Sequence, residues 1–305
     1  MSIVHTSYDH SRVLVLGAGL SGVAAAQLLR QRGCTMVALD EAPAERLVRA
    51  AAEFAALGVE LLAGTRALPD TPFDLCVTSP GFAMAHPWLE ACRARRIPVI
   101  AETELGFLYW PGRVLAITGS KGKSSLVKLC ADTLQGAGIP AEPAGNYGTP
   151  LSRLATTFSG HEGNTGTEPT IRMLASGGSG GPALPETPRV CQVGRGRRTR
   201  RDNVWAVVEV SSFQIEHLHA FRPDVAILLN LQADHLDRHA SMEEYRALKL
   251  RLFAQQAVGD VALLPEGLDD GGVVPSAAAR LTFGTGASCD WQYIAHGLRG
   301  RHAAT

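Results

Sequence analysis

The residues with the clearest chemical signature form one short segment after the apolar run 114–118. They are glycines, lysines and serines: Gly119, Ser120, Lys121, Gly122, Lys123, Ser124 and Ser125. In loops of this kind backbone amides cradle phosphate groups, a lysine places its charge on the β- and γ-phosphates, and a serine hydroxyl can ligate Mg²⁺. The usual spacing would put glycine at position 117, where Ile117 stands, so this is a shortened phosphate-binding loop.

A second glycine-rich turn, Gly17-Ala18-Gly19-Leu20-Ser21-Gly22, follows the apolar run 13–16, and Asp40 ends the next apolar run. Glycines let the backbone approach a ligand's phosphates at a helix N-terminus, and an acid about 20 positions later can bind a ribose hydroxyl. The pattern favours a nucleotide-like ligand such as NAD. A glycine turn that serves only helix packing is the alternative.

Acidic and imidazole side chains follow two later apolar runs. Glu209 lies near the end of the run 204–210, and a carboxylate beside a phosphate loop suits Mg²⁺. The loop after the run 225–229 contains two imidazoles and two carboxylates that could hold a second cation: Asp234, His235, Asp237 and His239. Taken without the phosphate loop, Glu209 equally fits an acid at a strand end that faces solvent or caps a neighbouring element, and the second cluster fits an ordinary polar loop.

Lys249 lies in an amphipathic segment that is expected to be helical over about residues 241–255. Tyr245, Leu248 and Leu252 share one face of that helix, and Lys249 lies one turn after Tyr245 at the edge of this face. A lysine in such a position ordinarily extends its ammonium into water. The residues alone give Lys249 no further role.

The elements that must position these residues alternate as in parallel sheets covered by helices. The expected strands are the apolar runs 13–16, 35–39, 59–62, 75–78, 98–100, 114–118, 204–210, 225–229 and 261–264. Helical segments are expected after Lys123, Ser211 and Ser241. The predicted fold class is α/β, with a Rossmann-like parallel-sheet domain over residues 1–101 and a P-loop mononucleotide-binding domain over residues 102–305.

One segment, placed at about residues 152–203, breaks this order. Between residues 157 and 188, 19 of 32 positions are Gly, Ser, Thr or Pro, and six of the next 13 are arginine. Because no helix or strand period survives there, a disordered surface insertion is expected. The arginine-rich run 195–201 would suit contact with nucleic acid, but a solvated loop is the commoner meaning of such a run.

Composition limits the class of protein. With 305 residues, 46% hydrophobic and 19% charged, the chain is too long and too apolar for a disordered tail. Basic and acidic side chains both number 29, which argues against a general affinity for nucleic acid or anionic membranes. Six scattered cysteines indicate buried, reduced thiols instead of disulfides or a zinc site. The apolar stretch after Arg12 is broken by glycines and too short to span a membrane, so a cytoplasmic protein is expected.

Taken together and in this order, the motifs resemble those of the Mur ligases. The resemblance runs from about residue 13 to residue 298. It includes both glycine-rich turns, Ser79-Pro80-Gly81, Gly145-Asn146-Tyr147-Gly148, the string EVSSFQIE at 209–216 and the string NLQADHLDRH at 230–239. The string EVSSFQIE discriminates most, since members of the family that add other amino acids look different there.

The resemblance implies an ATP-dependent, amide-forming ligase of peptidoglycan precursor synthesis that uses Mg²⁺. Its substrates would be UDP-N-acetylmuramoyl-L-alanine and D-glutamate. The L-alanine carboxylate would attack the γ-phosphate of ATP, and the amine of D-glutamate would open the resulting acyl phosphate. Lys123 and metal ions would neutralise the developing charge. A monomer without nucleic-acid or membrane partners is expected.

Site residues follow from the same resemblance. ATP would be held by Lys123 and the loop from Gly119 to Ser125. Ser124 and Glu209 would ligate a first Mg²⁺. His235 would ligate a second together with Lys249, which in this family is carbamylated by CO2 and so becomes an anionic ligand. The catalytic residues would then be Lys123, His235 and Lys249. UDP-sugar contacts, in place of an NAD site, match Gly19, Leu20, Ser21, Gly22, Asp40, Gly81, Asn146 and Ser211.

The sequence departs from the family pattern in three places. Lys121 stands where the family has asparagine, and the segment between Pro150 and Glu209 is longer than usual. The sequence ends at Thr305, where the family continues into a third domain that recognises D-glutamate. We therefore expect a chain without that domain, which binds the UDP-sugar and nucleotide but has lost ligase turnover. The alternatives are a non-catalytic UDP-sugar- or nucleotide-binding protein and an NAD-dependent oxidoreductase.

Overall fold

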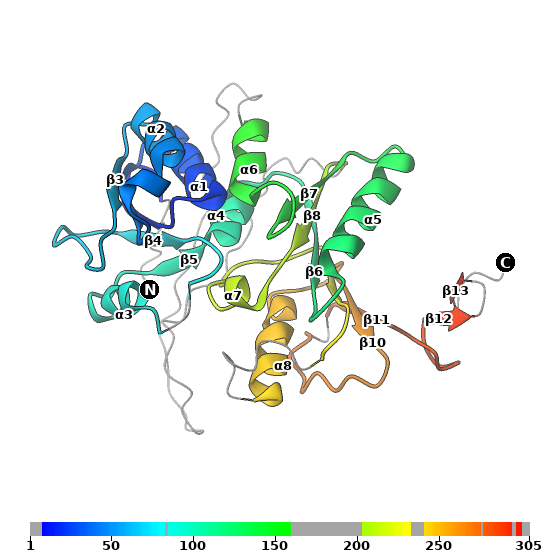
Figure 1. Ribbon diagram of the computed structural model, residues 1–305. Helices are drawn as coiled ribbons and strands as arrows, with labels where there is room; N and C mark the ends of the chain where they lie inside the picture. Colours follow the sequence, from blue (N-terminus) through cyan, green and yellow to red (C-terminus); the bar gives the residue numbers. More distant parts are fainter. Residues whose placement is uncertain are drawn as a thin grey trace, which may run out of the picture.

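The computed structural model describes residues 8–82, 85–159, 203–232, 241–275, 277–294 and 297–300. In these parts of the chain two β-sheets stand in tandem, each with helices packed against it (Figure 1). The first sheet uses strands before residue 102, and the second uses strands from residue 113 onward. Each sheet together with the helices packed against it forms one unit. The predicted α/β class is confirmed.

The first sheet has five parallel strands in the order β3-β2-β1-β4-β5. Their bounds are β1 Arg12–Leu16, β2 Thr35–Asp40, β3 Glu60–Ala63, β4 Leu75–Thr78 and β5 Val99–Ala101. Val13 and Val15 of β1 pack in one apolar cluster, whereas Leu14 and Leu16 pack in another. Because successive side chains point to opposite faces and both faces are buried, this strand is continuously apolar.

Helices cover both faces of the first sheet. Leu28, Phe54 and Leu105 pack in the cluster of Val13, whereas Trp88 packs in the cluster of Leu14. These side chains come from α1 Leu20–Gln31, α2 Val48–Ala56, α4 Glu102–Tyr109 and α3 Pro87–Ala94 respectively, and a short 3-10 helix, η1 Ala44–Arg46, precedes α2.

The second sheet has eight strands in the order β13-β12-β11-β10-β9-β6-β8-β7, and only the β12–β13 pair is antiparallel. The bounds are β6 Arg113–Thr118, β7 Ala141–Gly145, β8 Trp205–Glu209, β9 Val225–Leu228, β10 Val261–Pro265, β11 Ala279–Gly284, β12 Trp291–Ile294 and β13 Gly297–Gly300. Since β6 lies between β8 and β9, the loops that follow these three strands meet at one edge of the sheet.

Helices of the second sheet lie on opposite sides. Val127 and Ala131 of α5 Lys123–Gly136 pack against one face, with Ile117 and Ile227. Ile215 and Leu250 pack in the cluster of the other face. They belong to α7 Ser212–Ile215 and α8 Met242–Leu250.

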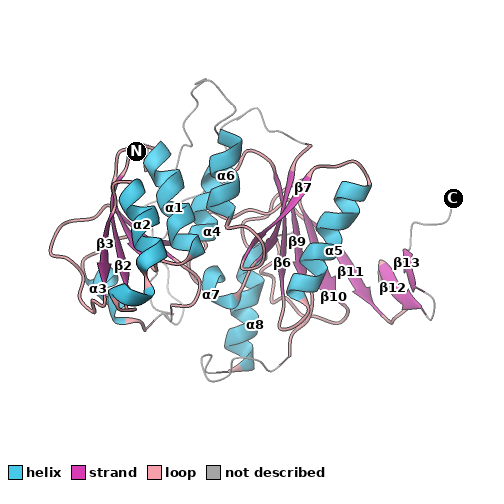
Figure 2. Ribbon diagram, turned by 45° about the horizontal axis from the view of Figure 1, so that its top comes forward, coloured by secondary structure: helices cyan, strands magenta, loops and turns pink. Residues whose placement is uncertain are grey.

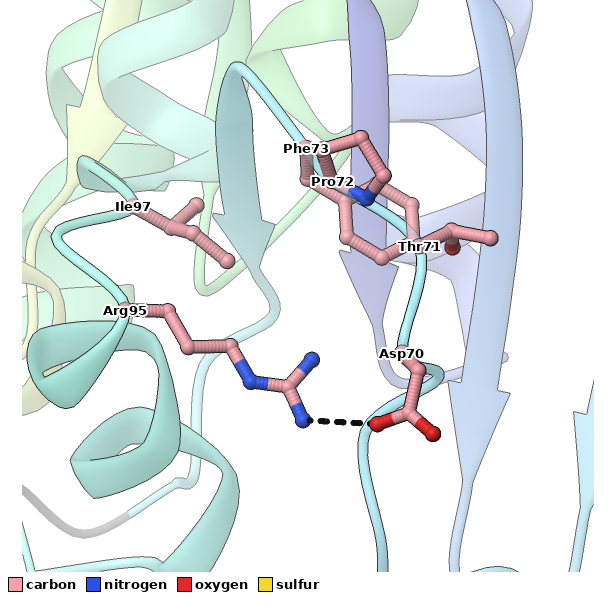
Figure 3. A pocket seen from close by; sticks show the side chains of 6 residues that line it. All are labelled: Asp70, Thr71, Pro72, Phe73, Arg95 and Ile97. Atoms are coloured by element: carbon pink, nitrogen blue, oxygen red, sulfur yellow. Dashed lines mark ion pairs between the residues drawn. The ribbon is translucent and has the colours of Figure 1, made fainter.

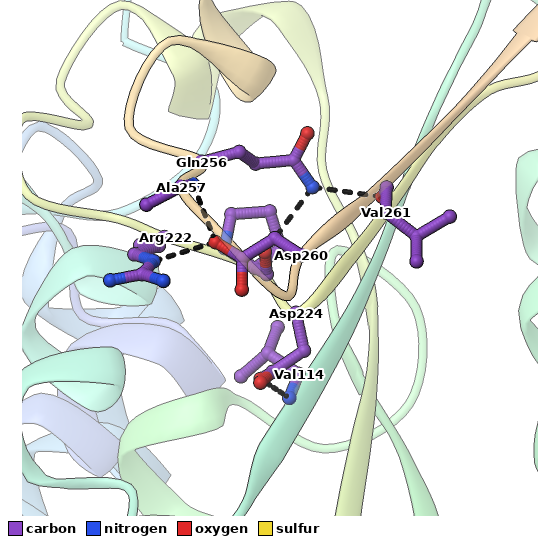
Figure 4. Close-up of polar contacts among 8 residues, drawn as sticks. Val114, Arg222, Asp224, Gln256, Ala257, Asp260 and Val261 are labelled. Carbon is purple, nitrogen blue, oxygen red and sulfur yellow. Dashed lines mark hydrogen bonds and ion pairs between the residues drawn. The ribbon is translucent and has the colours of Figure 1, made fainter. Parts of the chain in front are cut away.

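Buried carboxylates lie at the end of the second sheet where β9 and β10 begin (Figure 4). Asp224 accepts a hydrogen bond from the backbone N–H of Val114 at 2.9 Å. Asp260 accepts from the backbone N–H of Ala257 at 2.8 Å and from Arg222 Nε at 2.6 Å. The two carboxylates accept hydrogen bonds from backbone N–H groups at this end of the sheet. The loops after β6, β8 and β9 lie at the opposite end.

Helix α6 Leu151–Ser159 follows β7 in the chain but stands beside α1 and α4 of the first unit (Figure 2). Ala155 packs in the first sheet's cluster, whereas Leu151 and Leu154 pack in the second sheet's cluster. The two units therefore share α6, which the prediction of two consecutive domains did not anticipate.

Two predicted boundaries differ from the structure. The insertion that is expected over about 152–203 starts too early, since α6 extends to Ser159. Leu151, Leu154, Ala155 and Phe158 recur at helical spacing there. The rest of that segment, residues 160–202, lies outside the described residues. The helix expected over 241–255 ends at Leu250 and continues as a 3-10 helix, η2 Arg251–Phe253.

None of the helices in the described ranges is both long and apolar enough to cross a membrane. The apolar stretch after Arg12 divides into β1, the glycine turn and α1, as predicted. The cysteines in these ranges have free thiols, of which Cys34, Cys76, Cys92 and Cys289 are buried and Cys130 is partly buried. Cys191 lies outside the described residues.

Candidate functional site

The phosphate-binding loop joins β6 to the N-terminus of α5, as the sequence predicts. Gly119 and Gly122 have φ angles of 153° and 82°, which residues with a side chain rarely adopt. Gly122 directly precedes the first turn of α5, where backbone N–H groups have no partner within the helix. Loop amides and the positive end of the helix dipole could therefore hold an anion.

Asn230, directly after β9, fixes the shape of this loop. The backbone N–H groups of Ser120 and Lys121 both donate to Asn230 Oδ1 at 3.0 Å, and Asn230 Nδ2 donates to the carbonyl of Lys121 at 2.9 Å. The side chain of Lys121 is exposed. Sequence reasoning did not assign Asn230 to the site; its one signal was an amide at the end of the strand adjacent to β6.

The Ser124 hydroxyl donates to Glu209 Oε2 at 2.6 Å, and Asn146 Nδ2 donates to Glu209 Oε1 at 3.0 Å. The backbone N–H of Asn146 also donates to the carbonyl of Glu209, at 3.1 Å. Glu209 is only 3% exposed, so the interpretation of a solvent-facing acid is wrong. The structure brings together three predicted site residues from α5, the end of β8 and the loop after β7.

Lys123 lies within the loop itself. Its Nζ donates to the carbonyls of Gly119 and Ser120, at 3.0 and 2.9 Å. The side chain is half-buried, whereas Ser125, in the same first turn of α5, is exposed. The ammonium is thus held beside the loop amides, where their phosphate ligand would lie.

Lys249 does not extend into water, because its side chain is only 1% exposed. Its Nζ donates to Thr118 Oγ1 at 3.2 Å and to the carbonyl of Gly119 at 3.0 Å, and it lies 4.9 Å from the centre of the Tyr245 ring. Tyr245 Oη is in turn 3.4 Å from Ser120 Oγ. Lys249 and Tyr245 of α8 therefore support the phosphate-binding loop from inside the protein.

Ser211 begins α7 with a capping box. Its hydroxyl and its backbone N–H both donate to Gln214 Oε1 at 2.9 Å, and the backbone N–H of Gln214 donates back to Ser211 Oγ at 3.3 Å. Gln214, which the sequence analysis did not assign, is 2% exposed. The pattern Ser-x-x-Gln before an apolar residue was a readable signal for this cap.

The glycine turn of the first unit is braced by Asp40. One carboxylate oxygen of Asp40 accepts from the backbone N–H of Ala18 at 2.7 Å, and the other accepts from Ala42 at 2.8 Å. A Cβ atom at Gly22 would lie 1.8 Å from the carbonyl oxygen of Gly17, so only glycine fits there. Both oxygens of Asp40 thus have backbone partners, an arrangement that shapes the turn.

Four further predicted residues lie in or beside that turn. Gly19 and Leu20 begin α1, where Leu20 is 64% exposed and Ser21 is half-buried. Gly81 lies in the loop after β4, with φ of 112°. Because β1 and β4 are parallel neighbours, this loop and the glycine turn share one sheet edge.

Four candidate metal ligands, Asp234, His235, Asp237 and His239, lie outside the described residues. Within the described ranges, no three side chains of His, Cys, Asp or Glu come close enough to hold a metal ion. The first Mg²⁺ would therefore depend on Ser124 and Glu209 together with oxygens from its ligand.

A cavity of about 420 Å³ lies in the first unit, next to an ion pair of 3.5 Å between Arg95 and Asp70 (Figure 3). Its lining residues Phe73 and Ile97 precede β4 and β5, whereas the glycine turn and Gly81 follow strands. The cavity is therefore at the opposite end of the sheet from the candidate site.

The sequence matches the family described as Mur ligase middle domain over residues 117–280. It is 35% identical to UDP-N-acetylmuramoylalanine--D-glutamate ligase of Koribacter versatilis over 83% of this chain and 47% of that protein. It is 36% identical to the ligase of the same name from Nitratidesulfovibrio vulgaris, over 85% of this chain and 51% of that protein. The chain thus spans about half the length of the curated relatives it matches.

The fold has a counterpart among solved structures. The UDP-N-acetylmuramate:L-alanyl-gamma-D-glutamyl-meso-diaminopimelate ligase of Neisseria meningitides superposes with a TM-score of 0.53 at 17% identity. The superposition covers 95% of this chain and 84% of that one. At this identity the likeness concerns the fold.

Proposed function

This chain belongs to the Mur ligase family, and we propose that it carries the UDP-sugar- and ATP-binding parts of a ligase that joins D-glutamate to UDP-N-acetylmuramoyl-L-alanine. The reaction makes an amide from a carboxylate and an amine. The L-alanine carboxylate takes the γ-phosphoryl group of ATP, and the amine of D-glutamate then displaces phosphate from the acyl phosphate.

The loop from Gly119 to Ser125 would hold the phosphates of ATP. Lys123 Nζ, which bonds two carbonyls of the loop, would turn to the β- and γ-phosphates and offset their charge. Asn230 keeps the amides of Ser120 and Lys121 in place, so the loop is formed before its ligand arrives. The exposed ammonium of Lys121 would add a second positive charge at the mouth of the loop.

Mg²⁺ fits the residues that are present. Ser124 Oγ and Glu209 Oε2 are hard oxygen donors, 2.6 Å apart, at the phosphate-binding loop. Bound there, Mg²⁺ would neutralise charge on the transferred phosphoryl group. Asn146 holds the other oxygen of Glu209 and so orients the carboxylate. We also propose that Lys249, in carbamylated form, and His235 bind a second Mg²⁺.

The UDP-sugar would lie across the first sheet's edge and reach the second unit. Gly19, Leu20 and Ser21 at the N-terminus of α1 would receive its diphosphate, while Gly22 and Asp40 shape the turn beneath them and Gly81 borders it. Asn146 and Ser211, at the ends of β7 and β8, would contact the sugar and peptide parts.

The observation that carries this proposal is the contact chain from Ser124 through Glu209 to Asn146. It joins the residues proposed to hold ATP, Mg²⁺ and the UDP-sugar through two hydrogen bonds of 2.6 and 3.0 Å. The acceptor carboxylate and the γ-phosphate must meet for the reaction to occur, and the proximity of these three side chains supports binding of the two substrates next to each other.

The nucleotide half of the proposal is tested with isothermal titration calorimetry of ADP in the presence of Mg²⁺. Lys123→Ala is expected to weaken binding at least tenfold, since a charge-assisted phosphate contact is lost. Lys128→Ala is the matched control, because Lys128 is on the same helix but exposed and paired with Asp132 at 2.7 Å. Equal affinities of the wild type and Lys123→Ala would remove Lys123 from the site.

The substrate half is tested by titrating UDP-N-acetylmuramoyl-L-alanine into the folded chain. Binding is expected, and Asn146→Ala is expected to weaken it about tenfold through loss of a polar contact and of the brace on Glu209. NADH, followed by its fluorescence, serves as the comparison ligand and should show no enhancement. A folded chain that enhances NADH fluorescence and ignores the UDP-sugar would replace this proposal with a nicotinamide site.

A further inference from the structure

Three consecutive side chains at the start of α4 connect the two units. Glu102, Thr103 and Glu104 are 1%, 0% and 2% exposed, although all three are charged or polar. They form the start of α4, directly after the last strand of the first sheet. Each reaches a different segment that follows a strand of the second sheet. Burying a polar group is unfavourable unless the group finds a hydrogen-bond partner. These three contacts therefore indicate that the start of α4 does more than link the two units.

Glu102 and Glu104 contact backbone. Glu102 Oε1 accepts from the backbone N–H of Ser152 at 2.7 Å, at the start of α6. Glu104 Oε1 accepts from the backbone N–H of Ala220 at 2.6 Å, in the segment between α7 and β9. These two contacts fix where the second unit lies against α4.

Thr103 instead contacts the side chain of Gln214, which in turn contacts Ser211 of the proposed substrate site. Gln214 Nε2 donates to Thr103 Oγ1 at 2.7 Å, and both groups are buried. The other end of the same carboxamide, Oε1, accepts from the hydroxyl and the backbone N–H of Ser211. The Ser211 backbone N–H can only donate and therefore selects Oε1 at its end of the carboxamide, while Thr103 Oγ1 supplies the acceptor that the buried NH2 group needs at the other end.

This orientation determines what Ser211 can offer to a ligand. A hydroxyl has a single proton, and Ser211 donates it to Gln214 Oε1 at 2.9 Å. One lone pair of Ser211 Oγ accepts from the backbone N–H of Gln214. The other lone pair can accept a hydrogen bond from a hydroxyl or an amide N–H of the ligand. Without the Thr103 contact, the NH2 group of Gln214 would be buried with no partner at that end, and the carboxamide would be driven to reorient.

We propose that Thr103 is a positioning residue for the UDP-sugar site: through Gln214 it holds the Ser211 hydroxyl as a hydrogen-bond acceptor for a donor group of the ligand. This inference rests on the proposed function. Thr103 belongs to the helix that leaves the first unit, so binding at Ser211 depends on how the two units are joined. Thr103 itself does not touch the ligand.

The test compares Thr103→Val with Thr103→Ser by calorimetry. Valine has the shape of threonine but cannot accept a hydrogen bond, whereas serine keeps the acceptor. Thr103→Val is expected to weaken binding of UDP-N-acetylmuramoyl-L-alanine about fivefold to thirtyfold, and Thr103→Ser by less than threefold. Affinity for ADP with Mg²⁺ should stay within twofold in both variants, since the side chains that hold the phosphate-binding loop, Asn230, Tyr245 and Lys249, lie outside α4. A general loss of structure would weaken both ligands together and would overturn the proposal.

A double-mutant cycle with Gln214→Met isolates the pathway. Because Thr103 acts through Gln214, Thr103→Val should have no further effect on UDP-sugar affinity in the Gln214→Met background. Additive effects in the cycle, or a wild-type affinity in Thr103→Val, would overturn the inference and leave the proposed function standing. A wild-type chain that binds ADP but no UDP-sugar would overturn the proposed substrate and this inference with it.

Discussion

At the scale of single residues, Gly22 shows how little space the first glycine turn has. A Cβ atom there would lie 1.8 Å from the carbonyl oxygen of Gly17, which belongs to the backbone and cannot move without opening the turn. At Gly19, three residues earlier, a Cβ atom would meet nothing within 4 Å, and φ is −76°. The two glycines differ in what they permit although both fit one sequence motif.

We therefore predict that Gly22→Ala lowers the free energy of unfolding by about 3 kcal/mol, because overpacking against backbone cannot relax. Gly19→Ala is the control and should change it by less than about 1 kcal/mol, the cost of a poorer helix cap. Urea denaturation followed by circular dichroism measures both. Equal effects of the two substitutions would contradict the close approach at Gly22.

The same scale shows which site residues could be predicted. Lys123, Ser124 and Glu209 could, because charge, hydroxyl and carboxylate stand at strand ends beside glycines. The burial of Lys249 could not be predicted from the sequence of its own helix, because the groups that it contacts, Thr118 and Gly119, are about 130 residues away in sequence. Pairwise contacts of this kind leave no periodic signal.

At the scale of elements, strands that form apolar runs were predictable, including the edge strands β3 and β5, whereas the edge strand β7 was not. The strand β4 agrees with its apolar run at every residue. The strand β7 was missed because it has the sequence AEPAG, in which proline and glycine are poor strand formers. It still pairs with β8 at the sheet edge, where tertiary contacts override its propensity.

Helix α6 was not predicted, because the segment rich in Gly, Ser, Thr and Pro starts within its last residues. Its place depends on Gly106 of α4, where a Cβ atom would lie 2.5 Å from the backbone nitrogen of Ser152. The absence of a side chain lets the two helices touch backbone to backbone. A helical glycine, which sequence rules treat as a weakness, is here a packing requirement.

Gly106→Ala is therefore expected to separate α4 from α6 and to lower the free energy of unfolding by about 2 kcal/mol. Gly136→Ala, at the last residue of α5, meets nothing within 4 Å and should be neutral or stabilise by up to about 1 kcal/mol. Opposite signs in chemical denaturation support the close contact. A stabilising Gly106→Ala would show that α4 and α6 have room to spare.

At the scale of the whole molecule, the two units are joined by acids that lie out of water. Burial raises the pKa of Glu102 to about 7, opposed by hydrogen bonds from Ser152 and Thr103, and burial likewise raises the pKa of Glu104 to about 7. The charge of Glu104 adds to burial in raising the pKa of Tyr8. The backbone N–H of His219 donates to Glu104 Oε2 at 3.3 Å, and burial lowers the pKa of the His219 imidazole. The junction between the units therefore titrates near neutral pH.

The direction of the resulting pH effect follows from proton binding. Between pH 4.5 and 7 the folded chain binds more protons at Glu102 than the unfolded chain does, so this stabilising contribution is complete below pH 4.5 and is lost as pH rises to about 7. The difference is on the order of 3 kcal/mol for the 2.5-unit rise. His219 acts in the opposite sense below pH 6.5, because its folded form gives up a proton.

Glu102→Gln isolates the effect, since glutamine keeps the acceptor for Ser152 and stays neutral at every pH. One carboxylate oxygen of Glu102, Oε2, has no hydrogen-bond partner, so an NH2 group there displaces no contact. The variant is expected to lie within about 1 kcal/mol of the wild type at pH 5 and to exceed its free energy of unfolding by on the order of 3 kcal/mol at pH 8. His219 contributes equally to both proteins and cancels. Urea denaturation at pH 5, 6, 7 and 8 measures the difference, with Glu60→Gln as the control, because Glu60 of β3 is exposed. A constant difference across this range would mean that Glu102 does not titrate in the junction.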